Sequence, residues 1–114
     1  MNGEEIEIFV GDASDMRATV YARYRPVQGE SVSLSGRLRG PFCEGVRTLA
    51  AEFVFRDLAP DQPGVAAAVV TDPCRWTPEL PHLYQVDVAA RRGAELVAEY
   101  HGTLGLRWPA SPRE

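Results

Sequence analysis

The sequence predicts an all-β fold, an antiparallel sandwich of two sheets with seven to eight strands. Apolar and polar residues alternate with a period of two along most of the chain, which is typical of strands with one buried face. Clusters of proline and glycine separate the alternating runs, as turns do between short strands. The 114 residues, 45% of them hydrophobic, suffice for one domain with its own core.

The first half of the chain contains four expected strands, at residues 6–10, 16–25, 32–39 and 47–56. In the second run Val20 and Ala22, for example, alternate with Thr19 and Arg23. A helix would instead need apolar residues three and four positions apart. Turn signals separate these runs, and we expect residues 42–45 to form a loop.

The second half is less regular. Residues 64–70 do not alternate, so we expect a strand that is covered on both faces, with a helical turn as the alternative. Residues 83–90 and 95–100 should form a hairpin through the glycine-containing connection 91–94. Residues 103–108 would extend the last strand beyond Gly102, where the glycine suggests a bulge.

We therefore expect one domain over residues 1–108 and a flexible tail over residues 109–114. Its core should be made by the inward members of the alternating runs, because these share one face of each strand. They are Ile6, Ile8, Val20, Leu34, Leu38, Leu49, Phe53, Val69, Leu83, Val86, Val88 and Leu96.

Charge and composition exclude several partners and compartments. A net charge of −4 and a pI near 5.2 leave no basic footprint for nucleic acid or for an anionic membrane. The chain contains no run of about 18 apolar residues, the length that a membrane-spanning helix needs. The first residues are acidic and do not resemble an export signal, so a cytoplasmic location is favoured. Cys43 and Cys74 lack the paired spacing of a zinc site, and we expect free thiols, no metal and no cofactor.

The most constrained stretch of the sequence is Asp72-Pro-Cys-Arg-Trp-Thr-Pro-Glu-Leu-Pro-His-Leu-Tyr84. Its three prolines fix φ and remove backbone donors, so the stretch should cross between strands as an extended bridge. Trp76 and Tyr84 add large apolar rings with a polar group at one end, which suits the closing of one end of a sandwich. The stretch is therefore predicted to act as a rigid clasp.

This stretch resembles the signature that closes the immunoglobulin-like β-sandwich of family 2 glycoside hydrolases, the β-galactosidase and β-glucuronidase group. The later tract Leu104-Gly-Leu-Arg107 is similar to the family's Phe-Gly-Phe/Ile-Arg, with Leu104 in place of the usual aromatic residue. The resemblance implies an immunoglobulin-like fold. It also implies that catalytic glutamates belong to a following (β/α)8 barrel of about 250 residues, a length that 114 residues do not contain.

The sequence offers no catalytic constellation of its own. Glycoside hydrolysis uses two carboxyl groups about 5–10 Å apart, and nothing places a second carboxylate opposite Glu79. His82 and His101 have no acidic residue or cysteine at ligand spacing. We therefore expect no enzymatic activity from this chain.

Two functions are compatible with these observations. The first is a non-catalytic module that packs against another domain or protein. The alternative is a carbohydrate-binding module with an exposed aromatic platform. The candidate contact residues for either are Trp108, Trp76 and Tyr84, although a packing role in the fold is favoured for Trp76. The sequence fits equally a complete protein and a piece of a longer enzyme, in any oligomeric state.

Overall fold

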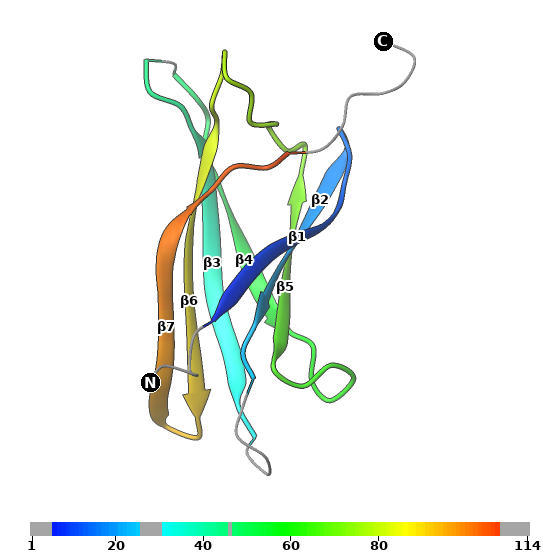
Figure 1. Cartoon of the computed structure of the whole chain (residues 1–114), viewed down its shortest axis with the longest axis vertical. Coiled ribbons are helices and arrows are strands. Elements are labelled where there is room, and N and C mark those ends of the chain that lie inside the picture. Colours follow the sequence, from blue (N-terminus) through cyan, green and yellow to red (C-terminus); the bar gives the residue numbers. More distant parts are fainter. Residues whose placement is uncertain (1–5, 26–30, 46, 108–114) are drawn as a thin grey trace.

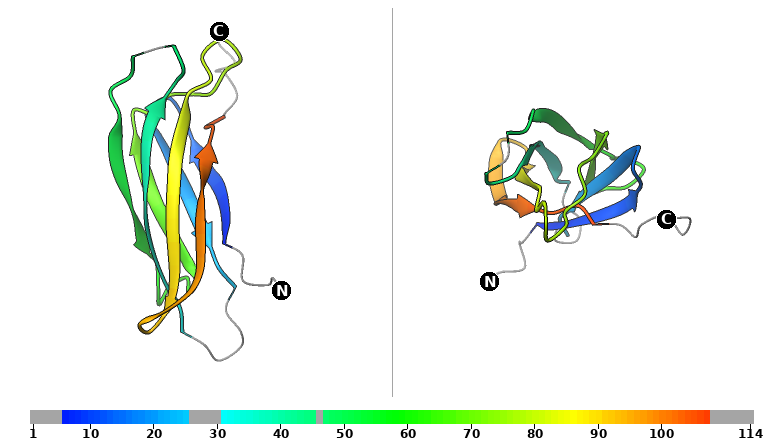
Figure 2. Two further views of the ribbon diagram at one scale, coloured as in Figure 1. Left: turned by 90° about the vertical axis from the view of Figure 1, so that its left-hand side faces the viewer. Right: turned by 90° about the horizontal axis from the view of Figure 1, so that it is seen from above.

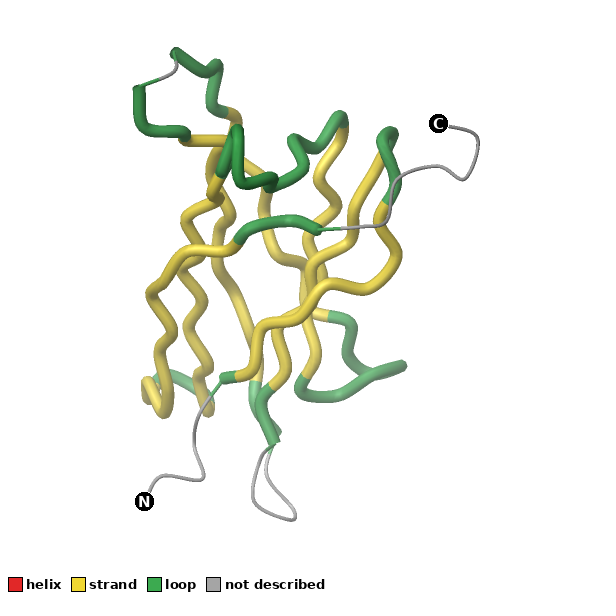
Figure 3. The backbone as a smooth tube through the Cα atoms, turned by 45° about the horizontal axis from the view of Figure 1, so that its top comes forward, coloured by secondary structure: helices red, strands yellow, loops and turns green. Residues whose placement is uncertain are grey.

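The computed structural model describes residues 6–25, 31–45 and 47–107, which form strands joined by loops and contain no helix (Figure 3). No helix in this part of the chain is thus long and apolar enough to cross a membrane. The strands are β1 (Glu7–Ala13), β2 (Arg17–Arg23), β3 (Ser33–Phe42), β4 (Ala51–Asp57), β5 (Val65–Thr71), β6 (Leu83–Arg92) and β7 (Glu95–Leu104).

The strands follow the order β1-β2-β5-β4-β3-β6-β7, and every neighbouring pair is antiparallel. β1, β2 and β5 form one layer and β3, β6 and β7 the other, as the side and end views show (Figures 1 and 2). β4 joins the layers, because it pairs with β3 from Ala51 to Phe55 and with β5 only at Arg56 and Asp57. The sheet thus curls on itself, and the predicted all-β sandwich-type fold is confirmed.

The core lies between the two layers. Small side chains from β2 and β5 face larger ones from β3 and β6, so the layers interdigitate. Those larger buried residues include Leu34, Leu38, Tyr84, Val86 and Val88, each exposed by 3% or less. Among the predicted core residues, Ile6, Val20, Leu34, Leu38, Val86 and Val88 are buried, and Ile8 and Phe53 pack against the core while partly buried.

Four core predictions are wrong. Leu49 is 95% exposed because it lies in the loop before β4, which begins only at Ala51. Leu83 is 36% exposed because the buried residues of β6 begin with its neighbour Tyr84, on the other face. Neither residue therefore occupies the inward strand position that we expected.

The other two errors arise from β5 and from a bulge. β5 alternates like the other strands and is covered on one face only, so Ala68 and Val70 are buried while Val69 is 46% exposed. In β7 the pairing passes from Leu96 to Ala98 while β6 advances by a single residue, which leaves Val97 as the extra residue of a bulge. Leu96 lies on the hairpin side of that bulge and is 42% exposed.

Two strand boundaries and one expected bulge also differ from expectation. Phe42 belongs to β3 rather than to a loop, and Gly102 pairs in register with Val86, so the expected bulge at Gly102 is wrong. β7 ends at Leu104, which makes seven strands in the described residues. The predicted hairpin is confirmed: β6 and β7 are joined by a two-residue turn in which Gly93 has a φ of 63°. The expected tail, residues 109–114, lies outside the described residues.

Candidate interaction site at one end of the sandwich

The segment between β5 and β6 carries the chain from one layer to the other, and three backbone N–H groups hold it in place. The N–H of Asp72 donates to the carbonyl of Met16 (3.1 Å), and the N–H of Trp76 donates to the carbonyl of Leu106 (2.7 Å). The N–H of Cys74 donates to the hydroxyl of Tyr84 (3.0 Å). We call residues 72–82 the clasp. Its three anchors lie just before β2, on β6 and on the segment after β7.

Tyr84 is the buried anchor of the clasp. Its ring is 1% exposed and packs on Gly40, where a Cβ would lie 2.7 Å from the ring. Burial raises the pKa of the phenol, and the hydrogen bond from Cys74 acts in the opposite direction. A tyrosine at the start of this strand that bonds an upstream backbone group resembles the tyrosine corner of immunoglobulin domains. Its ring is therefore part of the interior and is not presented to solvent.

Trp76 is half-buried against the segment that follows β7. A Cβ at Gly105 would lie 2.8 Å from the indole, so only glycine fits there without displacement. The guanidinium of Arg107 lies over the indole, 4.1 Å from the ring centre, within the range of a cation–π contact. The chain itself thus covers part of the ring that a sugar would need. Trp108, the third candidate, lies outside the described residues.

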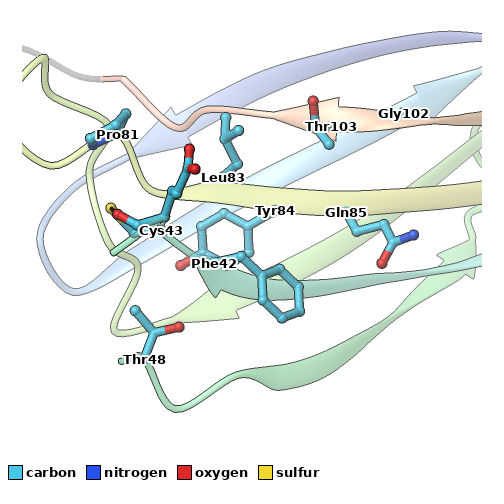
Figure 4. Close-up of a pocket in the computed structure, with 10 residues that line it drawn as sticks. Phe42, Cys43, Thr48, Pro81, Leu83, Tyr84, Gln85, Gly102 and Thr103 are labelled. Carbon is cyan, nitrogen blue, oxygen red and sulfur yellow. Dashed lines mark hydrogen bonds between the residues drawn. The ribbon is translucent and has the colours of Figure 1, made fainter. Parts of the chain in front are cut away.

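Beside the clasp, the outward face of β3 and β6 is hollowed into a groove of about 600 Å³ (Figure 4). Phe42 and Leu83 are cross-strand partners on this face, and they remain 45% and 36% exposed. Cys43, Pro81 and Tyr84 also line it. We call this feature the end groove.

The rim of the end groove is polar, and most of its polar groups are already bonded. The hydroxyl of Thr48 donates to the carbonyl of Pro41 (2.5 Å), and Oε1 of Gln85 accepts from Arg39 (3.0 Å). Glu44 is exposed on the same rim. Cys43 is buried and Cys74 is half-buried, and both are free thiols, as predicted.

Farther along β3 and β6, and on the adjoining β4 and β7, the outward face is charged and internally paired. Arg37 lies 3.4 Å from Glu52, and Nδ1 of His101 lies 2.7 Å from Asp87. Glu99 lies 3.5 Å from Nε2 of the same histidine. Hydrogen bonding to Asp87, with a smaller contribution from Glu99, raises the pKa of His101. We call these five residues the paired face.

The acidic and imidazole groups do not come together as a metal site in the described part of the chain. Glu79 is exposed on the clasp. His82 is half-buried, and its Nδ1 has no hydrogen-bond partner among the described residues. What this end of the molecule offers is an apolar surface on a braced backbone.

Sequence reasoning missed the two exposed side chains of the end groove. Phe42 was expected in a loop and Leu83 in the core, but both point outward from strands. The signal for Leu83 was present, because two large apolar residues at 83 and 84 cannot both face the core of one regular strand.

The comparisons with known proteins agree on one relationship. The model of glycosyl hydrolases family 2 matches residues 5–107. A family 2 member from Bacteroides cellulosilyticus has a similar structure, with a TM-score of 0.53 and 20% identity over 92% of this chain and 15% of its own. A β-glycosidase from Bacteroides vulgatus has a TM-score of 0.50 and 15% identity over 91% of this chain and 13% of its own.

A β-glucuronidase of glycoside hydrolase family 2 aligns with 90% of this chain and 11% of its own, with a TM-score of 0.48 and 10% identity. No curated protein matches the chain. At such identities the structural likeness concerns the fold, and the chain spans only 11–15% of the length of these three proteins. The match over residues 5–107 shows that this chain belongs to glycosyl hydrolases family 2.

Proposed function

We propose that this chain is a non-catalytic accessory β-sandwich that acts by packing against another domain or protein. The main support is a pair of coverages: the family match extends over residues 5–107, yet the chain spans only 13–15% of the two solved structures with TM-scores of 0.50 and 0.53. The family resemblance implies that hydrolysis depends on two carboxylates of a separate barrel. In this proposal the sandwich supports such a barrel and takes no part in its chemistry.

The structure of the clasp supports a packing role. The clasp is anchored at three points to different parts of the fold, so that end of the sandwich can hold its shape when another surface presses against it. The adjacent end groove keeps Phe42 and Leu83 partly in water. Exposed apolar patches on otherwise well-packed proteins commonly mark contact surfaces.

Cross-linking in the source cells tests the proposal. The chain, tagged in its natural setting, is treated with a short amine- and carboxyl-reactive cross-linker, and its linked peptides are sequenced by mass spectrometry. We expect links to a glycoside hydrolase barrel, in the same polypeptide or in another one. The matched control is the same experiment after denaturation, which should remove these links.

Two results would contradict the proposal. One is steady turnover of nitrophenyl glycosides by the purified chain that Glu79→Gln abolishes. The other is glycan binding that is lost in Trp76→Phe while the fold is retained, because this result would identify the chain as a carbohydrate-binding module.

A further inference from the structure

The end groove lies within a wider set of exposed apolar side chains. Phe42 and Leu83 line the end groove, and so do Thr48 and Pro81. The neighbours of those two lining residues in the sequence, Leu49 and Leu80, are 95% and 47% exposed. Exposing an apolar surface of this kind to water is unfavourable in free energy, and contact with another apolar surface removes that cost.

The composition of the end groove favours a protein partner over a sugar. Apart from Phe42, the exposed large apolar side chains in and beside the groove are Leu49, Leu80 and Leu83. Leucine side chains give no flat ring face for a pyranose, but they fit the side chains of another protein. A volume of about 600 Å³ is within the range of pockets that accept a compact ligand group.

The charge of the rim indicates which charged group a partner should carry. Glu44 is the single charged residue among those that line the groove. No ion pair or hydrogen bond joins its carboxylate to another described residue. The nearby Thr48 and Gln85 are already bonded to Pro41 and Arg39. A cation on the partner would therefore meet an acceptor that nothing in the described chain neutralises.

We propose that the end groove binds a protein segment that presents an apolar side chain next to an arginine or lysine. The apolar side chain lies between Phe42 and Leu83, and the cation pairs with Glu44. This inference rests on the proposed function, since it names the surface through which the module packs and the chemistry of the surface that it meets.

A pair of peptides tests the groove directly. The probes are the capped hexapeptide Gly-Arg-Leu-Leu-Arg-Gly and its twin with glutamate in place of each arginine, titrated into the ¹⁵N-labelled chain. We expect saturable amide shifts at Leu83 and at Thr103 of β7, which also lines the groove. The basic peptide should bind about two- to fivefold more tightly, because an exposed ion pair makes only a small contribution.

Three variants assign the effect to residues. Leu83→Ser should remove the saturable shifts. Leu96→Ser, the same change at a similarly exposed leucine at the other end of the β6–β7 hairpin, should leave them intact. Glu44→Gln should keep binding and remove the preference for the basic peptide.

Equal affinity for both peptides, shifts centred on Arg37 and His101, or no saturation at millimolar peptide would each overturn the inference. So would a dimer, seen by sedimentation without peptide, that Leu83→Ser dissociates, since the occupant would then be a second copy. Peptide binding without cross-links to a hydrolase barrel would keep the groove and refute the proposed partner. Cross-links without peptide binding would do the reverse.

Discussion

The outward side of the β3–β6–β7 layer has two regions with opposite chemistry. In the paired face, Asp87 and His101 satisfy each other across 2.7 Å. In the end groove, on the same strands, Phe42 and Leu83 stay 45% and 36% exposed, and Glu44 has no partner among the described residues. The paired face is complete by itself, whereas the end groove is a surface that a second molecule could complete. The same side of the layer thus has a region whose charged groups pair with one another and a region whose apolar groups remain exposed.

The two regions also rest on different supports. Beneath the paired face lies ordinary core, such as Val86 and Val88. Beneath the end groove lies Tyr84, whose hydroxyl bonds the clasp at Cys74. The end groove therefore lies over a buried residue that is also hydrogen-bonded to the clasp. This is expected if the groove must keep its shape when another molecule binds.

Replacing Tyr84, which lies beneath the end groove, should have the largest effect. Tyr84→Ala removes a fully buried ring and the anchor of Cys74, and we expect a loss of about 3–5 kcal/mol in the free energy of unfolding, as for other large buried aromatic residues. Urea melts measure this loss. Gln85→Ala, on the outward side of the same strand, is the control and should change stability by less than about 0.5 kcal/mol. A loss below about 1 kcal/mol for Tyr84→Ala would show that the clasp does not depend on this anchor.

Trp76→Ala should have a smaller effect, because the indole is only half-buried. We expect a loss of about 2–3 kcal/mol from its contacts with Gly105 and Arg107. Differential scanning calorimetry of Trp76→Ala and Trp76→Phe gives the comparison, with the phenylalanine variant recovering part of the loss. An unchanged melt for Trp76→Ala would mean that the indole has no packing role.

Removing a single oxygen isolates the hydrogen bond of the clasp. Tyr84→Phe should cost about 1 kcal/mol near neutral pH, since the N–H of Cys74 loses its acceptor. Burial raises the pKa of Tyr84 above its ordinary value of 10.0, so the phenol's contribution is present below pH 10.0 and is lost as the pH rises through the folded pKa. Wild type should therefore lose stability more steeply than Tyr84→Phe in that alkaline range. Parallel pH–stability curves for the two proteins would refute this.

The smallest effect concerns the paired face. The hydrogen bond from Asp87 is the main cause of the raised pKa of His101, so Asp87→Asn should lower that pKa toward 6.5. With its folded pKa raised, His101 contributes stability below about pH 6.5 and loses it as the pH rises through the folded value. NMR titration of the imidazole protons measures the pKa directly. A pKa that stays raised in Asp87→Asn would assign the shift to Glu99 instead.

The sequence predicts the fold well where local pattern decides it. The alternation of Ala18, Val20 and Ala22 and the turn at Gly93 depend on neighbours in the chain, and both agree with the structure. The clasp lies where its prolines indicate, but it is not extended throughout, because Thr77 and Leu80 bond each other in a turn. Its partners were not predicted, since the contacts of Trp76 with residues 105–107 join positions about 30 residues apart.

The candidate site was harder to predict because it depends on which face of its strand each residue occupies and on how neighbouring strands are aligned. A bulge at Val97 and the late start of β4 shift which apolar residues face inward, and neither leaves a clear mark on the pattern. The end groove exists because β3 and β6 pair Phe42 with Leu83, a register set by the whole sheet. Alternation alone could therefore identify apolar residues but not the ones left exposed.

The double variant Phe42→Ser, Leu83→Ser tests most directly whether the end groove serves contact rather than the fold. Its free energy of unfolding is measured in urea, and the same sample is titrated with the basic hexapeptide. We expect a loss of no more than about 1 kcal/mol in stability, because both side chains are partly in water already, together with complete loss of peptide binding. A loss above about 3 kcal/mol with unchanged peptide binding would show that these residues belong to the core and that the contact surface lies elsewhere.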